Sequence, residues 1–414
     1  MGRGTHVTFR SVFAVGEFRA LWAAEALSQA GDQLARVALA ILVYQRTGSA
    51  TLTGLTYALT LAPAFLGGIF LSGLADRFPR REVMVATDLV RALLIGLVAI
   101  PGVPFPVVYV LVAGVSFFQA PFKAAQLALL PAVLTGDLYV VGTGIRTITM
   151  QTAQMVGFVG GGVLVNAINP FLALAVDSLT FLLSGLLVRF GVRDRPAAAT
   201  KTNRPSLVNS VGRGASIIWR DKGLRVLVLL NWLTALLIVY EGLAAPYTDE
   251  IGGGPIAVGL ILASDPLGSV IGALVFSRWV SPPTRARVLG PLAIASCLPL
   301  MVCFLLPGVA ASIALFVLAG ALGTAVLMQS STAYTRGVPD HIRAQALGLS
   351  NAGLATVQGL SPLLAGVLAD GIGTAKTVAA VGVIGLFIAI PAAVAWQRAM
   401  TEDPNRWLHA TNNQ

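Results

Sequence analysis

The chain has 414 residues, of which 56% are hydrophobic and only 11% are charged, and its formal net charge is +10. A soluble domain carries about 25% charged residues, so this composition excludes an ordinary soluble domain and indicates a membrane protein. The basic residues are dispersed over short loops and form no single patch, which argues against nucleic-acid binding. Their excess on alternate loops follows the positive-inside pattern and predicts that both termini are cytoplasmic.

Apolar runs of about 20 residues, the length that crosses a bilayer, recur along the whole chain. We therefore expect an all-α membrane protein with twelve spans and no sizeable soluble domain. The expected spans are residues 17–45, 50–75, 83–101, 105–133, 138–166, 169–189, 224–248, 255–277, 288–306, 309–335, 344–369 and 375–397.

The longest polar stretch, residues 191–222, separates the spans into two sets of six. Displacing the chain by about 204 residues sets Thr152 on Thr356 and Gln154 on Gln358, inside spans five and eleven. Such matches favour a duplicated six-span unit with the substrate held between the halves. We expect an N-terminal bundle at residues 1–190, a cytoplasmic linker at 191–222, and a C-terminal bundle with a short cytoplasmic tail at 223–414.

The first span carries a polar stripe. Glu25, Gln29, Asp32 and Arg36 recur every three or four residues and therefore share one helix face. An ionisable group inside a span costs at least ~2.5 kcal/mol and normally faces a cavity or a partner. Asp32 lies near the middle of the span, where desolvation favours the neutral carboxyl group, so we predict that it couples transport to protons. The alternative is that Arg36, one turn away, only neutralises it.

Substrate contact is predicted for several further groups of the first half. Glu25 lies nearer the inner end of its span, and Gln29 lies one turn beyond it. In span four, Gln119, Lys123 and Gln126 repeat at helical spacing. Lys123 is a candidate counter-ion for Asp32 or for an anionic substrate, and the alternative is a lysine that extends to the interface.

The second half carries two candidate carboxylates and several amides. Glu241 in span seven is a candidate for gating or proton coupling, and Asp265, which precedes Pro266 in span eight, is a candidate for proton coupling, for substrate contact or for supporting the kinked backbone. Asn231 shares a face of span seven with Glu241. Other groups that can bond a substrate, or join neighbouring helices instead, are Arg146, Gln151, Gln154, Gln329, Asn351 and Gln358.

Enzyme chemistry is not indicated. The chain contains no GxxxxGK[ST] phosphate-binding loop, so we expect no ATPase activity. The three histidines fall in loops or near the termini, and the two cysteines lie within one apolar segment. We therefore expect neither a metal site nor a cofactor, and the energy for transport must come from an ion gradient.

A charged hairpin, SGLADRFPRRE at residues 72–82, lies between spans two and three. Its Leu74-Ala75-Asp76-Arg77 sequence followed by Arg80-Arg81 resembles the signature loop of the major facilitator superfamily, with Ser72 and Pro79 where that family usually has glycine. The resemblance implies two pseudo-symmetric six-helix bundles and a conformational switch on the inner face. The alternative is that the arginines only set topology. The predicted switch residues are Asp76, Arg77, Arg80 and Arg81 of the hairpin together with Asp88 and Arg91. These last two lie just inside span three, so we expect the opposite charges to gather at one inner-face site.

Other stretches resemble the drug-exporter branch of that superfamily, which includes macrolide and siderophore exporters. Residues 155–164, MVGFVGGGVL, resemble the glycine-rich span-five motif associated with antiport, with Phe158 at the usual proline position. The further matching stretches are GlyAspGln at 31–33, ThrAspLeuValArgAla at 87–92, AlaLeuLeuPro at 128–131, AspSerLeuThrPheLeu at 177–182 and ValProAspHisIleArgAlaGln at 338–345.

Taken together, these features predict a proton-coupled exporter of hydrophobic or amphipathic small molecules, working by alternating access as a monomer in a bacterial inner membrane. An excess of buried carboxylates over buried cations favours a cationic or neutral substrate. The alternative is a dedicated exporter of a siderophore, an antibiotic or a lipid. A transporter-like receptor or scaffold is more remote, because it gains nothing from the cost of inserting an acidic stripe.

Overall fold

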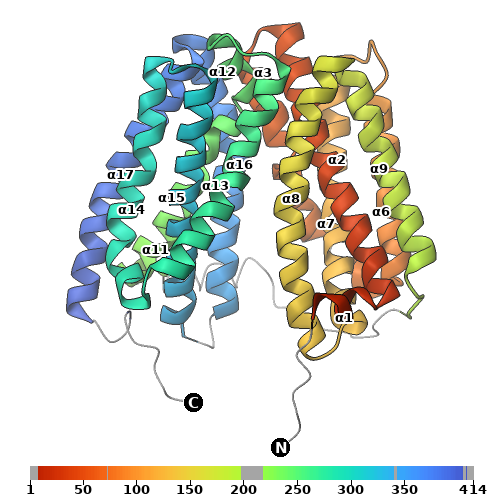
Figure 1. Cartoon of the computed structure of the whole chain (residues 1–414), viewed down its shortest axis with the longest axis horizontal. Coiled ribbons are helices and arrows are strands. Elements are labelled where there is room, and N and C mark those ends of the chain that lie inside the picture. The colour runs from red at the N-terminus through yellow and green to blue at the C-terminus, as the bar shows by residue number, and fades with distance from the viewer. Residues whose placement is uncertain (1–7, 72, 197–217, 340–342, 404–406, 408–414) are drawn as a thin grey trace, which may run out of the picture. The chain divides into compact units, whose positions relative to one another are not determined.

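The structure, a computed structural model, describes residues 8–71, 73–196, 218–339, 343–403 and 407. These residues form helices and connecting loops without any strand (Figure 1). Twelve long helical segments of this described part correspond to the twelve expected spans and confirm the predicted all-α membrane fold. A helix satisfies the backbone hydrogen bonds within its own segment, which the absence of water in a bilayer requires.

The helical segments follow the chain in two sets of six. The first six spans are α2 (Gly16–Thr47), α3 with α4 (Ala50–Leu59 and Ala62–Leu71), α6 (Arg80–Val98), α7 (Phe105–Val133), α8 (Asp137–Ala167) and α9 (Pro170–Gly191), with short helices α1 (Phe9–Phe13) and α5 (Leu74–Arg77) outside them. The last six are α11 (Lys222–Leu237) with η1 (Ile238–Glu241) and α12 (Ala244–Glu250), α13 (Pro255–Trp279), α14 (Pro282–Val302) with η2 (Cys303–Leu305), α15 (Gly308–Gly337), α16 (Arg343–Ile372) and α17 (Thr374–Glu402).

Ten of these segments in the described chain are long and apolar enough to cross a membrane by composition alone. The other two, α2 and α6, are the spans richest in charged side chains. Large apolar side chains such as Phe190 and Phe387 are 83% and 75% exposed, as expected of surfaces that face lipid. Charged side chains are costly to place in a lipid bilayer, and in this protein α2 and α6 carry the most of them.

Two of the expected spans are built from more than one α-helix. In the span expected at residues 50–75, α3 ends at Leu59 and α4 begins at Ala62. Pro63 is the second residue of α4, where its missing N–H costs no helical hydrogen bond. In the span expected at 224–248, a short 3₁₀ segment separates α11 from α12.

The chain divides into two compact units, residues 1–42 with 59–201 and residues 43–58 with 202–414. In the first unit, α6 packs against α7 and α9, and α4 packs against α7. In the second unit, α13 packs against α15 and α14 against α17, as can be followed in Figure 1. The predicted domain limits at residues 190 and 222 stay predictions, because much of the predicted linker lies outside the described residues.

Within the first unit, α2 and α8 approach each other at glycines of the MVGFVGGGVL stretch. A Cβ at Gly157 would overlap the carbonyl oxygen of Ala30, and a Cβ at Gly161 would lie 3.0 Å from that of Leu34. Close approach of this kind needs residues without side chains. The helix that carries Asp32 is therefore packed directly, backbone against backbone, on α8.

Candidate functional site

A buried arginine on α6 organises the interior of the first unit. Arg91, 1% exposed, donates from Nη2 to both carboxylate oxygens of Asp32 on α2, at 2.9 and 3.0 Å. Gln119 on α7 donates to the same carboxylate at 3.2 Å. The Arg91 guanidinium also lies 4.0 Å from the centre of the Phe181 ring on α9. Three hydrogen bonds thus hold Asp32 in one orientation between three helices.

Two more carboxyl groups lie close to this pair. Asp88, one turn before Arg91 on α6, is fully buried, and its Oδ1 lies 3.6 Å from Nη1 of Arg91. Its Oδ2 accepts a hydrogen bond from Ser184 at 2.6 Å, whereas Oδ1 accepts none from the described residues. Asp177 on α9 is also buried and lines a cavity together with Arg91 and Asp32. Three carboxyl groups therefore gather around one guanidinium.

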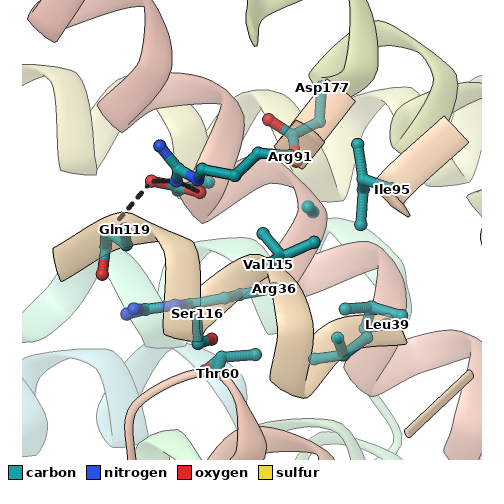
Figure 2. A pocket seen from close by; sticks show the side chains of 12 residues that line it. Arg36, Leu39, Thr60, Arg91, Ile95, Val115, Ser116, Gln119 and Asp177 are labelled. Carbon is teal, nitrogen blue, oxygen red and sulfur yellow. Dashed lines mark hydrogen bonds and ion pairs between the residues drawn. The ribbon is translucent and has the colours of Figure 1, made fainter. Parts of the chain in front are cut away.

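That cavity is small, about 30 Å³, and Figure 2 shows its lining from close by. Arg91 and Asp177 lie on one side, and Gln119, whose hydrogen bond to the Asp32 carboxylate is dashed, lies across from them. Arg36 lines the same cavity. The sequence offered Arg36 as the alternative, neutralising partner of Asp32 because it lies one turn away. In the structure both carboxylate oxygens of Asp32 accept from Nη2 of Arg91, on another helix.

A second cavity of about 360 Å³ shares Asp32, Arg91 and Gln119 with the first. Here Arg146 of α8 forms a bidentate pair with Glu25, with distances of 2.6 and 2.5 Å. Predicted substrate residues of the first half meet in this cavity, which Gln29, Lys123, Gln126 and Gln154 all line. The Asp32–Arg91 pair therefore stands where two cavities of the first unit adjoin.

Two side chains that line the larger cavity differ in their burial. Lys123 is exposed to it. Gln126 is 2% exposed, and its Nε2 finds no hydrogen-bond acceptor among the described residues. A buried amide without a partner is costly, and Gln126 lines the cavity with this donor unsatisfied.

In the second unit, Asn231 joins three helices. Its Oδ1 accepts from Ser330 at 2.5 Å and from Ser331 at 3.3 Å, and its amide donates to Ser350 at 3.5 Å. These bonds connect α11 with α15 and α16. A substrate that contacted Asn231, as the sequence predicts, would have to compete with them.

A cavity of about 170 Å³ lies in the same unit and is lined by Asp265 of α13, Tyr240 of η1 and Gln358 of α16. Glu241 is buried elsewhere in this unit and accepts a hydrogen bond from the Tyr57 hydroxyl of α3. Gln329 lines neither this cavity nor the two cavities of the first unit described above. Asp265, predicted for proton coupling, and Gln358, predicted for substrate contact, thus line one cavity, whereas Glu241 and Gln329 do not line it.

The residues assigned to the conformational switch fall into two groups. Near the hairpin, Arg81 pairs with Asp194 and Glu82, both at 3.0 Å, and Arg80 donates to the Ala128 carbonyl at 2.7 Å. Arg77 is exposed, and the side chain of Asp76 lies outside what the structure describes. Arg91 lies about 15 Å further along α6, given a rise of 1.5 Å per residue.

The sequence grouped Asp88 and Arg91 with the hairpin arginines at one inner-face site. The structure separates them, because Arg91 contacts Asp32 and Asp88 accepts from Ser184 inside the bundle. Asp177 and Ser184 were missed as site residues, although Asp177 opens the stretch at 177–182 and is an ionisable residue within a span. Among the described residues, no group of three His, Cys, Asp or Glu side chains is placed to hold a metal ion.

Comparisons with known proteins place this architecture in a family. Residues 21–245 match the sequence profile of the Major Facilitator Superfamily. The multidrug efflux pump Tap of Mycobacterium bovis is 25% identical over 370 residues, which cover 85% of this chain and 86% of that protein. Macrolide efflux protein A of Streptococcus pyogenes is 21% identical over 267 residues, covering 63% of this chain and 65% of that protein.

Solved structures agree at the level of the fold. A bacterial homologue of the human lysosomal transporter Spinster gives a TM-score of 0.73 at 14% identity and covers 95% of this chain and 98% of its own. The peptide transporter POT also gives 0.73 at 14% identity, covering 95% and 96%. The match over more than half of the chain, the twelve spans and the hairpin between the second and third of them show that this protein belongs to the Major Facilitator Superfamily of membrane transporters.

Proposed function

We propose that the chain is a proton-coupled exporter of hydrophobic or amphipathic small molecules, working by alternating access. The observation that carries the proposal is the cluster of Asp32, Asp88 and Asp177 around Arg91. The efflux named in the relatives Tap and macrolide efflux protein A supports the direction of transport. A dedicated exporter of one siderophore, antibiotic or lipid stays the alternative.

The cluster supports proton coupling through its charge. Each carboxylate placed within a membrane span is costly unless it is paired or protonated. Arg91 already makes its two shortest bonds to Asp32 and lies 3.6 Å from Asp88, whose Oδ1 has no hydrogen bond from the described residues. A proton bound by the cluster removes the excess negative charge, and its departure restores it. The cluster therefore supplies the titratable group that antiport needs.

Protonation of Asp32 also has a mechanical consequence. The neutral carboxyl group no longer accepts two charge-assisted hydrogen bonds from Arg91, so the link between α2 and α6 weakens. Arg91 keeps Asp88 and the Phe181 ring as neighbours and does not become an isolated charge. Loss of the α2–α6 link is the event that we propose biases the transporter toward its other conformation, with Arg77, Arg80 and Arg81 of the hairpin acting as the switch at the membrane surface.

The larger cavity of the first unit supports the substrate class. Its volume of about 360 Å³ lies in the range of about 300–1,000 Å³ that is usual for small-molecule sites. Amides of Gln29, Gln126 and Gln154 line it beside the charged side chains of Glu25 and Lys123. Groups of this kind orient the polar end of an amphipathic molecule. Of the remaining predicted roles, proton coupling at Arg36, Glu241 and Asp265 and substrate contact at Asn231, Gln329 and Gln358 stay proposals.

The test is efflux from cells and uptake into inside-out vesicles, measured for several dyes and drugs with and without a proton gradient. We expect gradient-driven transport by the natural chain and its loss in Asp32→Asn. Asp137→Asn is the matched control, because Asp137 is an exposed carboxylate at the start of α8. Transport that persists when the gradient is collapsed refutes the coupling, and full gradient-driven transport by Asp32→Asn refutes the role of Asp32.

The same vesicles test the placement in the membrane. We propose a monomer in the bacterial inner membrane with both termini and the linker at residues 191–222 on the cytoplasmic side. A protease added to inside-out vesicles should then cleave the linker, and the same protease added to right-side-out vesicles should leave it intact.

A further inference from the structure

The cavity of the second unit differs in charge from those of the first. It contains one carboxylate, that of Asp265, and no arginine or lysine among the described residues that line it. The cavities of the first unit contain Arg91, Arg146 and Lys123 beside their carboxylates. Among the three cavities described above, the second-unit cavity is therefore the one whose described lining offers no cation to balance its carboxylate.

The carboxylates of the two units also differ in their hydrogen-bond partners. Asp32 is bound by Arg91 and Glu25 by Arg146, each through two hydrogen bonds. Asp265 accepts one hydrogen bond, from the neutral hydroxyl of Tyr240 at 3.4 Å, and forms no salt bridge with a described residue. A carboxylate within a span is costly without a countercharge. The countercharge that the protein does not supply must come from a proton or from a ligand.

The cavity wall around Asp265 is firmly built. The Tyr240 ring stacks on Phe316 with a centroid distance of 4.0 Å and an angle of 9° between the planes. Gly320 of α15 faces Asp265 so closely that a Cβ there would lie 2.9 Å from the Asp265 carbonyl oxygen. Gly268 and Gly272 bring α13 equally close to α15. The carboxylate is thus held in place by helix packing and not by an ion pair.

We propose that Asp265 is the subsite for the cationic head group of a transported amphiphile, an organic ammonium or a comparable monovalent cation. The inference rests on the proposed function in that the chain carries small molecules, and it adds where their charge is recognised. Hydroxyl oxygens of Ser269 and Thr324, 2.7 Å apart, and the amide of Gln358 line the same cavity and can accept from the N–H groups of the ligand.

The size and composition of the cavity restrict the ligand further. Its volume of about 170 Å³ is below the range of about 300–1,000 Å³ for whole drug-sized molecules, so it takes the head group while the apolar remainder lies outside. Anions are disfavoured, because the described lining offers no cation. A metal ion is disfavoured because metal sites in proteins use several oxygen, nitrogen or sulfur ligands, and no group of three acidic, His or Cys residues in the described chain is placed to hold a metal ion.

The test is equilibrium binding to the purified full-length protein in lipid nanodiscs, without any gradient, using ethidium as a permanent cation and N-phenylnaphthylamine as an uncharged aromatic probe. We expect Asp265→Asn to weaken ethidium binding by ~10-fold or more, since a desolvated charge pair contributes more than one tenfold step in affinity. Binding of N-phenylnaphthylamine should change less than ~2-fold, within the effect of a surface substitution. Asp265→Glu should recover most of the ethidium affinity, and Glu402→Gln, an exposed carboxylate at the end of α17, should leave both probes unchanged.

Three results overturn the proposal. An unchanged affinity of Asp265→Asn for ethidium removes Asp265 from the site, and equal losses for both probes show a structural effect only. Displacement of ethidium by NaCl but not by KCl at equal ionic strength assigns the cavity to sodium. Because no gradient is present, these outcomes do not depend on proton coupling. If efflux by the natural chain is gradient-driven while Asp265→Asn binds ethidium with unchanged affinity, this inference alone is refuted and the proposed function stands.

Discussion

Replacing Arg91 by methionine tests the energetics of the carboxyl cluster most stringently. The substitution keeps an unbranched side chain but removes two hydrogen bonds to Asp32, at 2.9 and 3.0 Å, and the cation 3.6 Å from Asp88. Because Arg91 is 1% exposed and Asp88 is fully buried, water cannot replace the lost partner. Breaking a buried pair by removing one member costs about 3–5 kcal/mol, and we expect a loss of unfolding free energy of this size.

The assay is reversible unfolding in mixed detergent micelles, followed by tryptophan fluorescence at neutral and at acid pH. The loss should shrink as the pH falls, since a protonated carboxyl group does not need the guanidinium. Asp32→Asn should recover part of the stability of Arg91→Met, so the two substitutions should show a coupling energy of at least about 1 kcal/mol in a double-mutant cycle. A loss below about 1 kcal/mol, or additive effects, would refute the assignment of Arg91 as the partner that holds the cluster together.

Three further outcomes follow from contacts described by the structure. Gly161→Leu should destabilise the protein by about 1–3 kcal/mol and impair transport, because the leucine side chain must enter the α2–α8 contact. Gly160→Leu should be tolerated, because a Cβ there meets nothing within 4 Å. Thermal unfolding of the two variants measures the difference, and equal stabilities would contradict the prediction. Asp370→Ala should cost about 1 kcal/mol in unfolding free energy, since its carboxylate accepts at 2.6 and 3.1 Å from the first backbone amides of α3 as a helix cap does; a change within measurement error would contradict it. Arg146→Met should lower stability by less than Arg91→Met, because the Glu25–Arg146 pair is 12–13% exposed, and Glu25→Gln in the same chain should recover part of the loss.

The spans were predictable because apolar run length and loop charge both follow from the physics of a bilayer. The expected span at residues 105–133 coincides with α7, and most other ends agree within a few residues. The breaks after Leu59 and Leu237 were not predictable from hydropathy, because apolar residues lie on both sides of each break. Pro63, placed where a new helix begins, was the one local signal for the first break.

The site was predictable one helix at a time and not between helices. The stripe of Glu25, Asp32 and Arg36 is visible because residues three or four apart share a helix face. Periodicity cannot show that Arg91, 59 positions after Asp32 in the sequence, binds it, nor that Arg146 binds Glu25. Which spans pack together decides these pairs. For that reason the sequence offers Arg36 and Lys123 as candidate partners of Asp32 and gives no signal for Arg91.

The proposal that the Asp32 cluster couples transport to protons is tested most directly by proton release on substrate binding. Purified protein in weakly buffered solution with a pH-sensitive dye would be mixed with a substrate established by the efflux assay. Coupling is reciprocal, so a ligand that binds the deprotonated form must release protons. We predict proton release from the natural chain and from Asp137→Asn, and a marked loss of it in Asp32→Asn. Saturating substrate that releases no protons from the natural chain, or releases as many from Asp32→Asn, would contradict the account.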